Sequence, residues 1–237
     1  MSSAIRYLIV NADDFGYGRG INRGIAEAHD RGIVTSAPLM VNGRATDEAV
    51  ALAADRPRLS VGLHVNFTDE AQRLVEFDDP LTCRSELRRQ FDVFCDKMGR
   101  LPTHIDSHQH VHRDRRRRPY FRELAREYGL PLRDHSPVVF KGGFYGQWEY
   151  GVTDTSRVSY EALTAILGHE LPGGFYELAV HPGYVDPEFD MVYHRDREHE
   201  LSTLCDPRLP GFLDQHHIQL IGFGDLPAVL ARSGNVR

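Results

Sequence analysis

The sequence has no long hydrophobic run and no surplus of basic residues. No stretch of its 237 residues approaches the roughly 18 consecutive apolar residues that a membrane-spanning helix needs. Lysine and arginine number 28 against 34 aspartate and glutamate residues, so the formal net charge is −6 at pH 7. A chain with this balance has no net positive field to attract nucleic acid or an anionic membrane. We therefore expect neither as a partner.

Cysteine is also scarce. Cys83, Cys95 and Cys205 are the three cysteines of the chain and have no CxxC spacing, which argues against a disulfide framework and against a thiolate zinc site. The apolar run from Tyr7 to Val10 is too short for the core of a signal peptide and leads into two carboxylates. We expect a protein of a reducing compartment, the cytoplasm.

The remaining composition is that of an ordinary globular chain. Hydrophobic residues make up 41% and charged residues 26% of the sequence, which excludes a disordered or collagen-like chain. No internal repeat or linker divides the sequence, and its length suits one α/β barrel. We expect one domain over residues 1–237.

Short apolar runs alternate with amphipathic segments along the chain, which predicts parallel βα units. The expected fold is α/β, a TIM-like (β/α) barrel variant with about seven parallel strands. Long loops are expected at Phe67–Arg84 and Pro137–Arg157. The expected strands are Arg6–Asn11, Ser36–Val41, Ser60–Val65, His104–Ser107, Pro131–Arg133, Phe175–His181 and Gln219–Gly222.

Helices are predicted where apolar residues recur at spacings of three and four. Three such stripes end at Gly32, Gly99 and Gly129, and glycine is a common residue after a helix. Further helices are expected at Thr46–Asp55, Ser159–Leu167, Arg195–Cys205 and Leu226–Ala231.

Polar residues fall at or just after the ends of the expected strands. In a barrel of parallel strands all carboxyl ends meet on one face, so these side chains should converge there and form an active-site rim. They are Asn11, Asp13 and Asp14 after the first strand, Asn42 after the second, His64 in the third, His108 after the fourth and His181 at the end of the sixth.

Asp13 and Asp14 are adjacent carboxylates after an apolar strand. At such a place one carboxylate can bind a metal ion while the other takes a proton from water. Neighbouring strand residues point in opposite directions, so the pair serves one site only if the chain turns there. The alternative is that one of the two is a helix cap before Ile21.

Histidine is the unusual residue type, with 13 copies. The segment HIDSHQHVH, residues 104–112, holds four of them with one aspartate. Neutral imidazole is a common ligand for zinc and similar metals, whereas the alternative is a solvated polar loop. The arginine run at residues 113–118 is interpreted as a solvated loop, because no stacking motif accompanies it.

Four segments occur in a characteristic order: NADDFGYGRGINRGIAEAHDRGIVTSAPLMVNG, VGLHVN, PTHIDSHQHVH and ELAVHPGYVD. Together they resemble the YdjC-like carbohydrate deacetylases, a group that also contains the chitooligosaccharide and hopanoid-associated deacetylases. The resemblance covers residues 5–186. It implies a (β/α) barrel variant that removes an N-acetyl group from an amino sugar or sugar conjugate by hydrolysis, releasing acetate and a free amine.

The resemblance also implies roles for particular residues. Asp14, His64 and His108 correspond to the ligands of one divalent metal ion per chain, Asp13 to the catalytic base and His181 to the general acid. Two nitrogen ligands favour zinc over magnesium. Asn11 and Asp106 are candidates to support the ligands.

Substrate binding is expected from Asn42 on the rim and from Trp148 and Tyr150, whose rings could stack on sugar faces. The expected partner is a small N-acetylated sugar, with a homodimer as the expected assembly. A metal-dependent phosphoesterase or amidohydrolase is the alternative, because His110 and His112 match the HxH pair of two-metal barrels. A third reading is a non-catalytic protein that binds sugar or metal.

Overall fold

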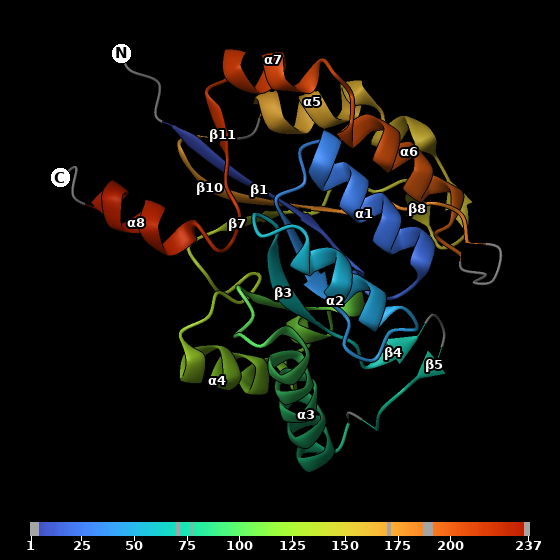
Figure 1. Ribbon diagram of the computed structural model, residues 1–237, viewed down its shortest axis with the longest axis vertical. Helices are drawn as coiled ribbons and strands as arrows, with labels where there is room; N and C mark the ends of the chain where they lie inside the picture. Colours follow the sequence, from blue (N-terminus) through green and yellow to red (C-terminus); the bar gives the residue numbers. More distant parts are fainter. Residues whose placement is uncertain (1–4, 70–71, 77, 170–171, 187–191, 235–237) are drawn as a thin grey trace.

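A curved sheet of seven parallel strands forms the centre of the described structure (Figure 1). The computed structural model describes residues 5–69, 72–76, 78–169, 172–186 and 192–234. The strand order is β6-β3-β2-β1-β10-β7, and β11 also pairs with β1. The strands are β1 (Arg6–Ala12), β2 (Ser36–Leu39), β3 (Ser60–Val65), β6 (Ile105–Ser107), β7 (Val139–Lys141), β10 (Gly174–Val180) and β11 (Ile218–Leu220).

The sheet forks at one edge of β1 and curls into a half-barrel. On that edge β11 pairs with Arg6–Leu8, whereas β2 pairs only at Asn11. The curl is visible in one contact: Nδ2 of Asn11 donates to Oδ2 of Asp106 at 3.1 Å, although β2 and β3 separate their strands in the sheet. The expected barrel variant with parallel strands is therefore confirmed.

Helices lie around the outside of this sheet (Figure 1), and two short hairpins and two 3-10 turns complete the described part. The helices are α1 (Arg19–Arg31), α2 (Thr46–Ala54), α3 (Pro80–Met98), α4 (Arg118–Tyr128), α5 (Tyr160–His169), α6 (Arg195–Leu204), α7 (Leu209–Gln215) and α8 (Leu226–Gly234). The hairpins are β4 (Thr68–Asp69) with β5 (Gln72–Arg73) and β8 (Gln147–Glu149) with β9 (Val152–Thr153), and the turns are η1 (His108–Arg113) and η2 (Thr155–Val158).

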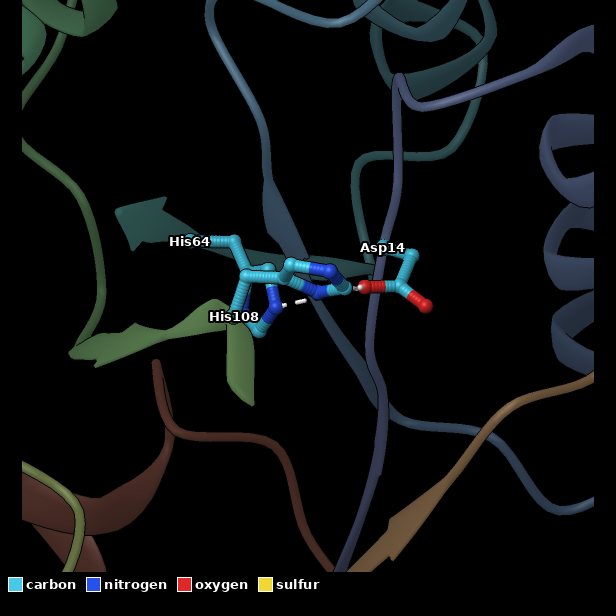
Figure 2. A group of neighbouring side chains, drawn as sticks. All are labelled: Asp14, His64 and His108. Carbon is cyan, nitrogen blue, oxygen red and sulfur yellow. Dashed lines mark hydrogen bonds and ion pairs between the residues drawn. The ribbon is translucent and has the colours of Figure 1, made fainter. Parts of the chain in front are cut away.

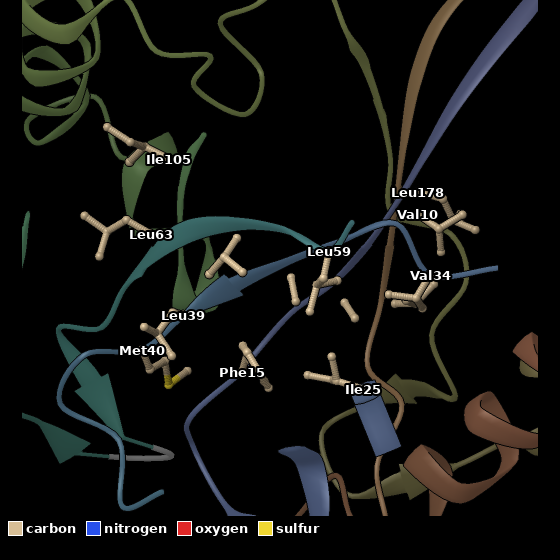
Figure 3. Close-up of a cluster of buried hydrophobic side chains, with 14 of the residues drawn as sticks. Val10, Phe15, Ile25, Val34, Leu39, Met40, Leu59, Leu63, Ile105 and Leu178 are labelled. Carbon is tan, nitrogen blue, oxygen red and sulfur yellow. The ribbon is translucent and has the colours of Figure 1, made fainter. Parts of the chain in front are cut away.

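The two faces of β1 have different partners, because successive side chains of a strand alternate between faces. Leu8 and Val10 belong to the large apolar cluster, of which Figure 3 shows Val10 beside Leu178 and Val34. Ile9 instead packs in a small cluster with Phe223 and Leu226. Asn11 lies on the same inner face as Ile9. The interior of the half-barrel is therefore apolar near the middle of β1 and polar near the carboxyl ends of the strands.

Several expected elements differ in the structure. Pro131–Arg133 makes one isolated bridge, Leu132 to Ile105, and forms no strand. The expected loop Pro137–Arg157 contains β7, β8, β9 and most of η2. Its apolar start forms the strand β7 because it pairs with β10. Helix α3 begins at Pro80, inside the other expected loop, because Oδ2 of Asp79 caps it by accepting the Thr82 N–H at 2.8 Å. Helix α7 was not expected.

The other expected helices form at or close to their predicted bounds. Gly99 and Gly129 end α3 and α4 in the left-handed conformation, with φ of 64° and 65°, which glycine adopts at little cost. Among the described residues, no helix has the length and apolar character needed to cross a membrane.

Candidate active site

Asp13 and Asp14 serve one region of space because the chain turns between them. Asp14 has a φ of 72°, a left-handed conformation that aspartate tolerates better than most residues. Helix α1 has Gly18 at its N-cap and no side-chain cap, so neither aspartate acts as the helix cap considered above. Both carboxylates are buried and line the same cavity.

Asp14, His64 and His108 come together at the carboxyl ends of β1, β3 and β6 (Figure 2). Oδ1 of Asp14 lies 3.0 Å from Nδ1 of His108 and 3.3 Å from Nε2 of His64. The candidate ligand atoms of all three lie within 4.8 Å of one another. One carboxylate and two imidazoles on a buried cluster suit a divalent transition metal.

His64 is oriented by a carboxylate behind it. Its Nδ1 lies 2.7 Å from Oδ1 of Asp106, an arrangement that leaves Nε2 directed at Asp14. Burial lowers the pKa of His64, but the Asp106 and Asp14 carboxylates outweigh burial and raise it to about 10. A cation bound at Nε2 would have to displace that proton, so metal affinity should fall as the pH falls.

Arg133 is a fully buried residue to which sequence reasoning assigned no role. Its guanidinium donates to both oxygens of Asp13 at 2.8 and 2.7 Å and lies 2.8 Å from Asp106 and 2.7 Å from Glu177. Burial raises the pKa of Asp13, but Arg133 outweighs burial and holds that pKa below its usual value. A sequence signal was present for Glu177, a charged residue inside the apolar run of β10.

The two oxygens of Asp14 have separate partners. Nη2 of Arg197, a buried residue of α6, lies 2.5 Å from Oδ2, which leaves Oδ1 directed at the two histidines. Burial raises the pKa of Asp14, but Arg197 and His108 hold it well below its usual value. The group Asp13, His64 and Asp106 also has metal-like spacing, yet the Arg133 cation already neutralises it. The Asp14 group is therefore the better cation site.

His181 ends the sixth expected strand and approaches Asp13. Its Nε2 lies 4.0 Å from Oδ2 of Asp13, and its Nδ1 lies 3.9 Å from Oε1 of Glu200. Burial lowers the pKa of His181 to about 4, so its imidazole is neutral at neutral pH. The rings of Tyr145 and Tyr193 meet it edge-on, with centroids at 5.2 and 5.8 Å.

Glu200 on α6 supports this side of the site. The buried carboxyl group accepts the backbone N–H of His181 at 2.5 Å and the hydroxyl of Tyr193. Burial raises the pKa of Glu200 to about 8, so it is largely protonated at neutral pH. Neither Glu200 nor Tyr193 carried a recognisable sequence signal, because their approach depends on how α6 packs.

A cavity of about 540 Å³ opens over these groups. Tyr150 lines it, whereas Trp148 and Asn42 are absent from its described lining; the Trp148 side chain is 63% exposed and Asn42 donates to the Asn66 carbonyl at 3.1 Å. Other lining residues include Asp13, Asp14, His64, His108, His110, Phe140, Tyr145, Arg157, His181 and Arg197.

His110 and His112 lie outside the candidate ligand group of Asp14, His64 and His108. His112 is buried, and its Nδ1 shares a hydrogen bond of 2.7 Å with the Ser107 hydroxyl. Among the described residues, neither histidine belongs to a group with metal-ligand spacing. The observation that favoured a two-metal phosphoesterase thus loses its structural basis.

Comparisons with known proteins agree with the resemblance found in the sequence. The family model described as YdjC-like protein matches residues 7–215. A carbohydrate deacetylase of Geobacillus stearothermophilus is 36% identical, over 92% of this chain and 97% of its own length. Carbohydrate deacetylase 2 of Listeria innocua serovar 6a is 32% identical, over 93% and 98%.

A crystal structure with a similar fold comes from Enterococcus faecalis V583, of a protein named for cellobiose-phosphate cleavage. It has a TM-score of 0.77 and 25% sequence identity, and the match covers 94% of this chain and 99% of that one. The similarity extends over nearly the whole length of both chains, so the half-barrel and its flanking helices are shared.

Proposed function

Because this chain belongs to the YdjC-like family, we propose that it is a carbohydrate deacetylase that hydrolyses the C–N amide bond of an N-acetylated amino sugar with the help of one divalent cation. The observation that carries the proposal is that the two neighbouring aspartates have different partners. Asp13 is bound by Arg133, while Asp14 faces two histidines. One carboxylate is thus suited to proton transfer and its neighbour to cation binding.

Asp14, His64 and His108 would hold the cation. When bound, the cation would polarise the acetyl carbonyl and lower the pKa of a water molecule. Two imidazole ligands favour zinc over magnesium, since magnesium prefers oxygen ligands.

Asp13 would take a proton from the attacking water. Arg133 keeps its carboxylate ionised and holds it in place through two hydrogen bonds. His181, neutral and 4.0 Å away, would receive this proton and pass it to the departing nitrogen. The water oxygen would join the acetyl carbon as Asp13 removes the proton. Protonation of the nitrogen by His181 would follow, the C–N bond would break, and acetate and a free amine would leave.

The substrate would enter through the 540 Å³ cavity, where Tyr150 lies in the wall. We keep Trp148 and Asn42 as contacts for parts of a longer sugar that extend beyond the cavity.

The family match over residues 7–215 supports one catalytic domain over residues 1–237. We also propose that the protein is a homodimer, which light scattering would test.

The test is acetate release from N-acetylglucosamine and its β-1,4-linked oligomers, with elemental analysis of the same preparation. We expect turnover, one equivalent of divalent metal per chain, and loss of turnover after chelation. The control is Asp13→Asn, which should keep the metal. Turnover that persists in metal-free protein, or two equivalents of tightly bound metal, would contradict the proposal.

A further inference from the structure

The backbone directly after His108 is strained. Gln109 and His110 are two consecutive non-glycine residues in the left-handed region, with φ of 49° and 53°. L-residues adopt this region at an energetic cost, and such conformations tend to occur at functional sites. The contact of His108 with Asp14 does not require a left-handed conformation at His110, two residues later. The conformation of His110 therefore calls for a separate explanation.

The strained turn presents His110 to the cavity that contains Asp13 and Asp14. The imidazole is held by ring contacts: it meets Phe140 edge-on at 5.5 Å between centroids and His112 at 5.8 Å. Phe140 is itself fixed, because the guanidinium of Arg133 lies 5.0 Å from the centre of its ring. These ring contacts give His110 a defined orientation, although no hydrogen bond to its ring comes from the described residues.

His110 differs from the other histidines of the segment in its hydrogen bonds. Nδ1 of His104 lies 3.0 Å from the Thr103 hydroxyl, and His108 and His112 are likewise bonded. No described residue bonds the ring of His110, and its Nδ1 is buried without a partner. Buried polar groups normally find partners, and an exception calls for a reason. The ligand group around Asp14 does not include His110, so metal binding does not supply that reason.

We propose that His110 is a substrate-binding residue whose imidazole hydrogen-bonds a hydroxyl group of the N-acetylated sugar. The inference rests on the proposed function, which supplies the sugar. An imidazole both donates and accepts hydrogen bonds, as a sugar hydroxyl does. A hydroxyl at this wall of the cavity would therefore supply the hydrogen bond that no described residue makes to the ring. The strained turn keeps His110 at that wall while His108 faces Asp14.

The test separates substrate binding from a structural role by means of two variants. His110→Gly removes the imidazole and suits the left-handed backbone. His110→Asn also tolerates that backbone and keeps a hydrogen-bonding group. For His110→Gly we expect KM for acetate release to rise roughly three- to tenfold, the scale of one or two lost hydrogen bonds, with kcat changed less. The melting temperature and metal content should stay close to those of the parent, and His110→Asn should recover part of the loss.

The matched control is His135→Gly, a change at an exposed histidine with no place in the cavity lining, which should leave KM unaltered. Sugar dissociation constants in the Asp13→Asn background, measured by calorimetry, should follow the KM values.

An unchanged KM in His110→Gly overturns the inference about His110 and leaves the deacetylase proposal standing. Loss of metal in His110→Gly also overturns the inference about His110. If the parent binds sugar without releasing acetate, only the deacetylase proposal falls, and binding should still weaken in His110→Gly. If the parent neither binds nor deacetylates these sugars, both fall.

Discussion

The cavity has two walls that are built in different ways. The first consists of residues at strand ends, such as Asp13 and His64, which are buried and ion-paired. The second is the β8–β9 hairpin, where Trp148 and Tyr150 are 63% and 70% exposed. The hairpin is tied to α6 by Gln147, whose Nε2 donates to Asp196 at 3.2 Å. Buried, charged groups thus form the wall at which the proposed bond cleavage would occur, while exposed aromatic rings form the wall at which a sugar would bind.

The largest expected effect comes from the strand-end wall. His64→Ala removes one of three candidate ligands and should abolish metal binding and activity together, because two ligands hold an ion poorly. Elemental analysis and acetate release on the same sample check this. Gln109→Ala, a change in the cavity lining outside the ligand group, should keep the metal. Full metal occupancy in His64→Ala would show that the cation binds elsewhere.

Asp13→Asn should separate proton transfer from metal binding. We expect kcat to fall by roughly a hundredfold or more, the scale of lost general base catalysis, while metal content is retained. Arg133 lowers the pKa of Asp13, so in the parent the base stays ionised well below neutral pH. Weakening the pair by Arg133→Lys should raise that pKa and move the acidic limb of kcat/KM to higher pH. Near-normal turnover by Asp13→Asn would refute the base assignment.

Arg133→Met tests how much of the fold depends on the same wall. The change leaves Asp13, Asp106 and Glu177 without their shared cation, and breaking a buried ion pair typically costs about 3–5 kcal/mol. Urea unfolding should show a loss of this size. Trp148→Met on the exposed hairpin should change stability by less than about 0.5 kcal/mol. Similar losses in the two variants would remove the contrast between the walls.

The hairpin wall should act on substrate affinity. Tyr150→Ala should raise KM by roughly tenfold with a smaller effect on kcat, because the ring lines the cavity. Trp148→Ala should raise KM less on a monosaccharide than on a longer oligomer, since the ring lies outside the described lining. Equal effects on sugars of all lengths would place Trp148 within the monosaccharide site instead.

A further prediction concerns the pH dependence of stability. Burial raises the pKa of Glu200 to about 8, above its value in the unfolded chain. The stabilisation linked to its proton is therefore complete below about pH 4.5 and is lost as the pH rises through about 8. Glu200→Gln cannot titrate, so its melting temperature relative to the parent should rise between about pH 5 and pH 9. A constant difference would contradict the raised pKa.

Much of the strand-end wall could be predicted from local sequence. Alternating apolar and amphipathic segments indicated parallel βα units, and parallel strands bring their carboxyl ends to one face. Strand ends placed Asp14, His64 and His108 on a common rim, and the family resemblance singled them out as the ligand group. The structure brings their candidate ligand atoms within 4.8 Å of one another. The hairpin wall was predicted only as a loop, since its strands form through pairing and not through a period of their own.

The sequence by itself determined the parallel α/β fold, most of the helices and the polar rim, since these depend on the periodicity and the ends of single elements. Only the tertiary structure decided that Arg133 binds Asp13, that Arg197 takes one oxygen of Asp14, and that Glu200 supports His181. These partners lie 120, 183 and 19 residues apart. The physical reason is that an unpaired charge is strongly unfavourable only when it is buried. The curled sheet and the packing of α6 bury these side chains, so the partner of each depends on the fold and cannot be predicted from the local sequence.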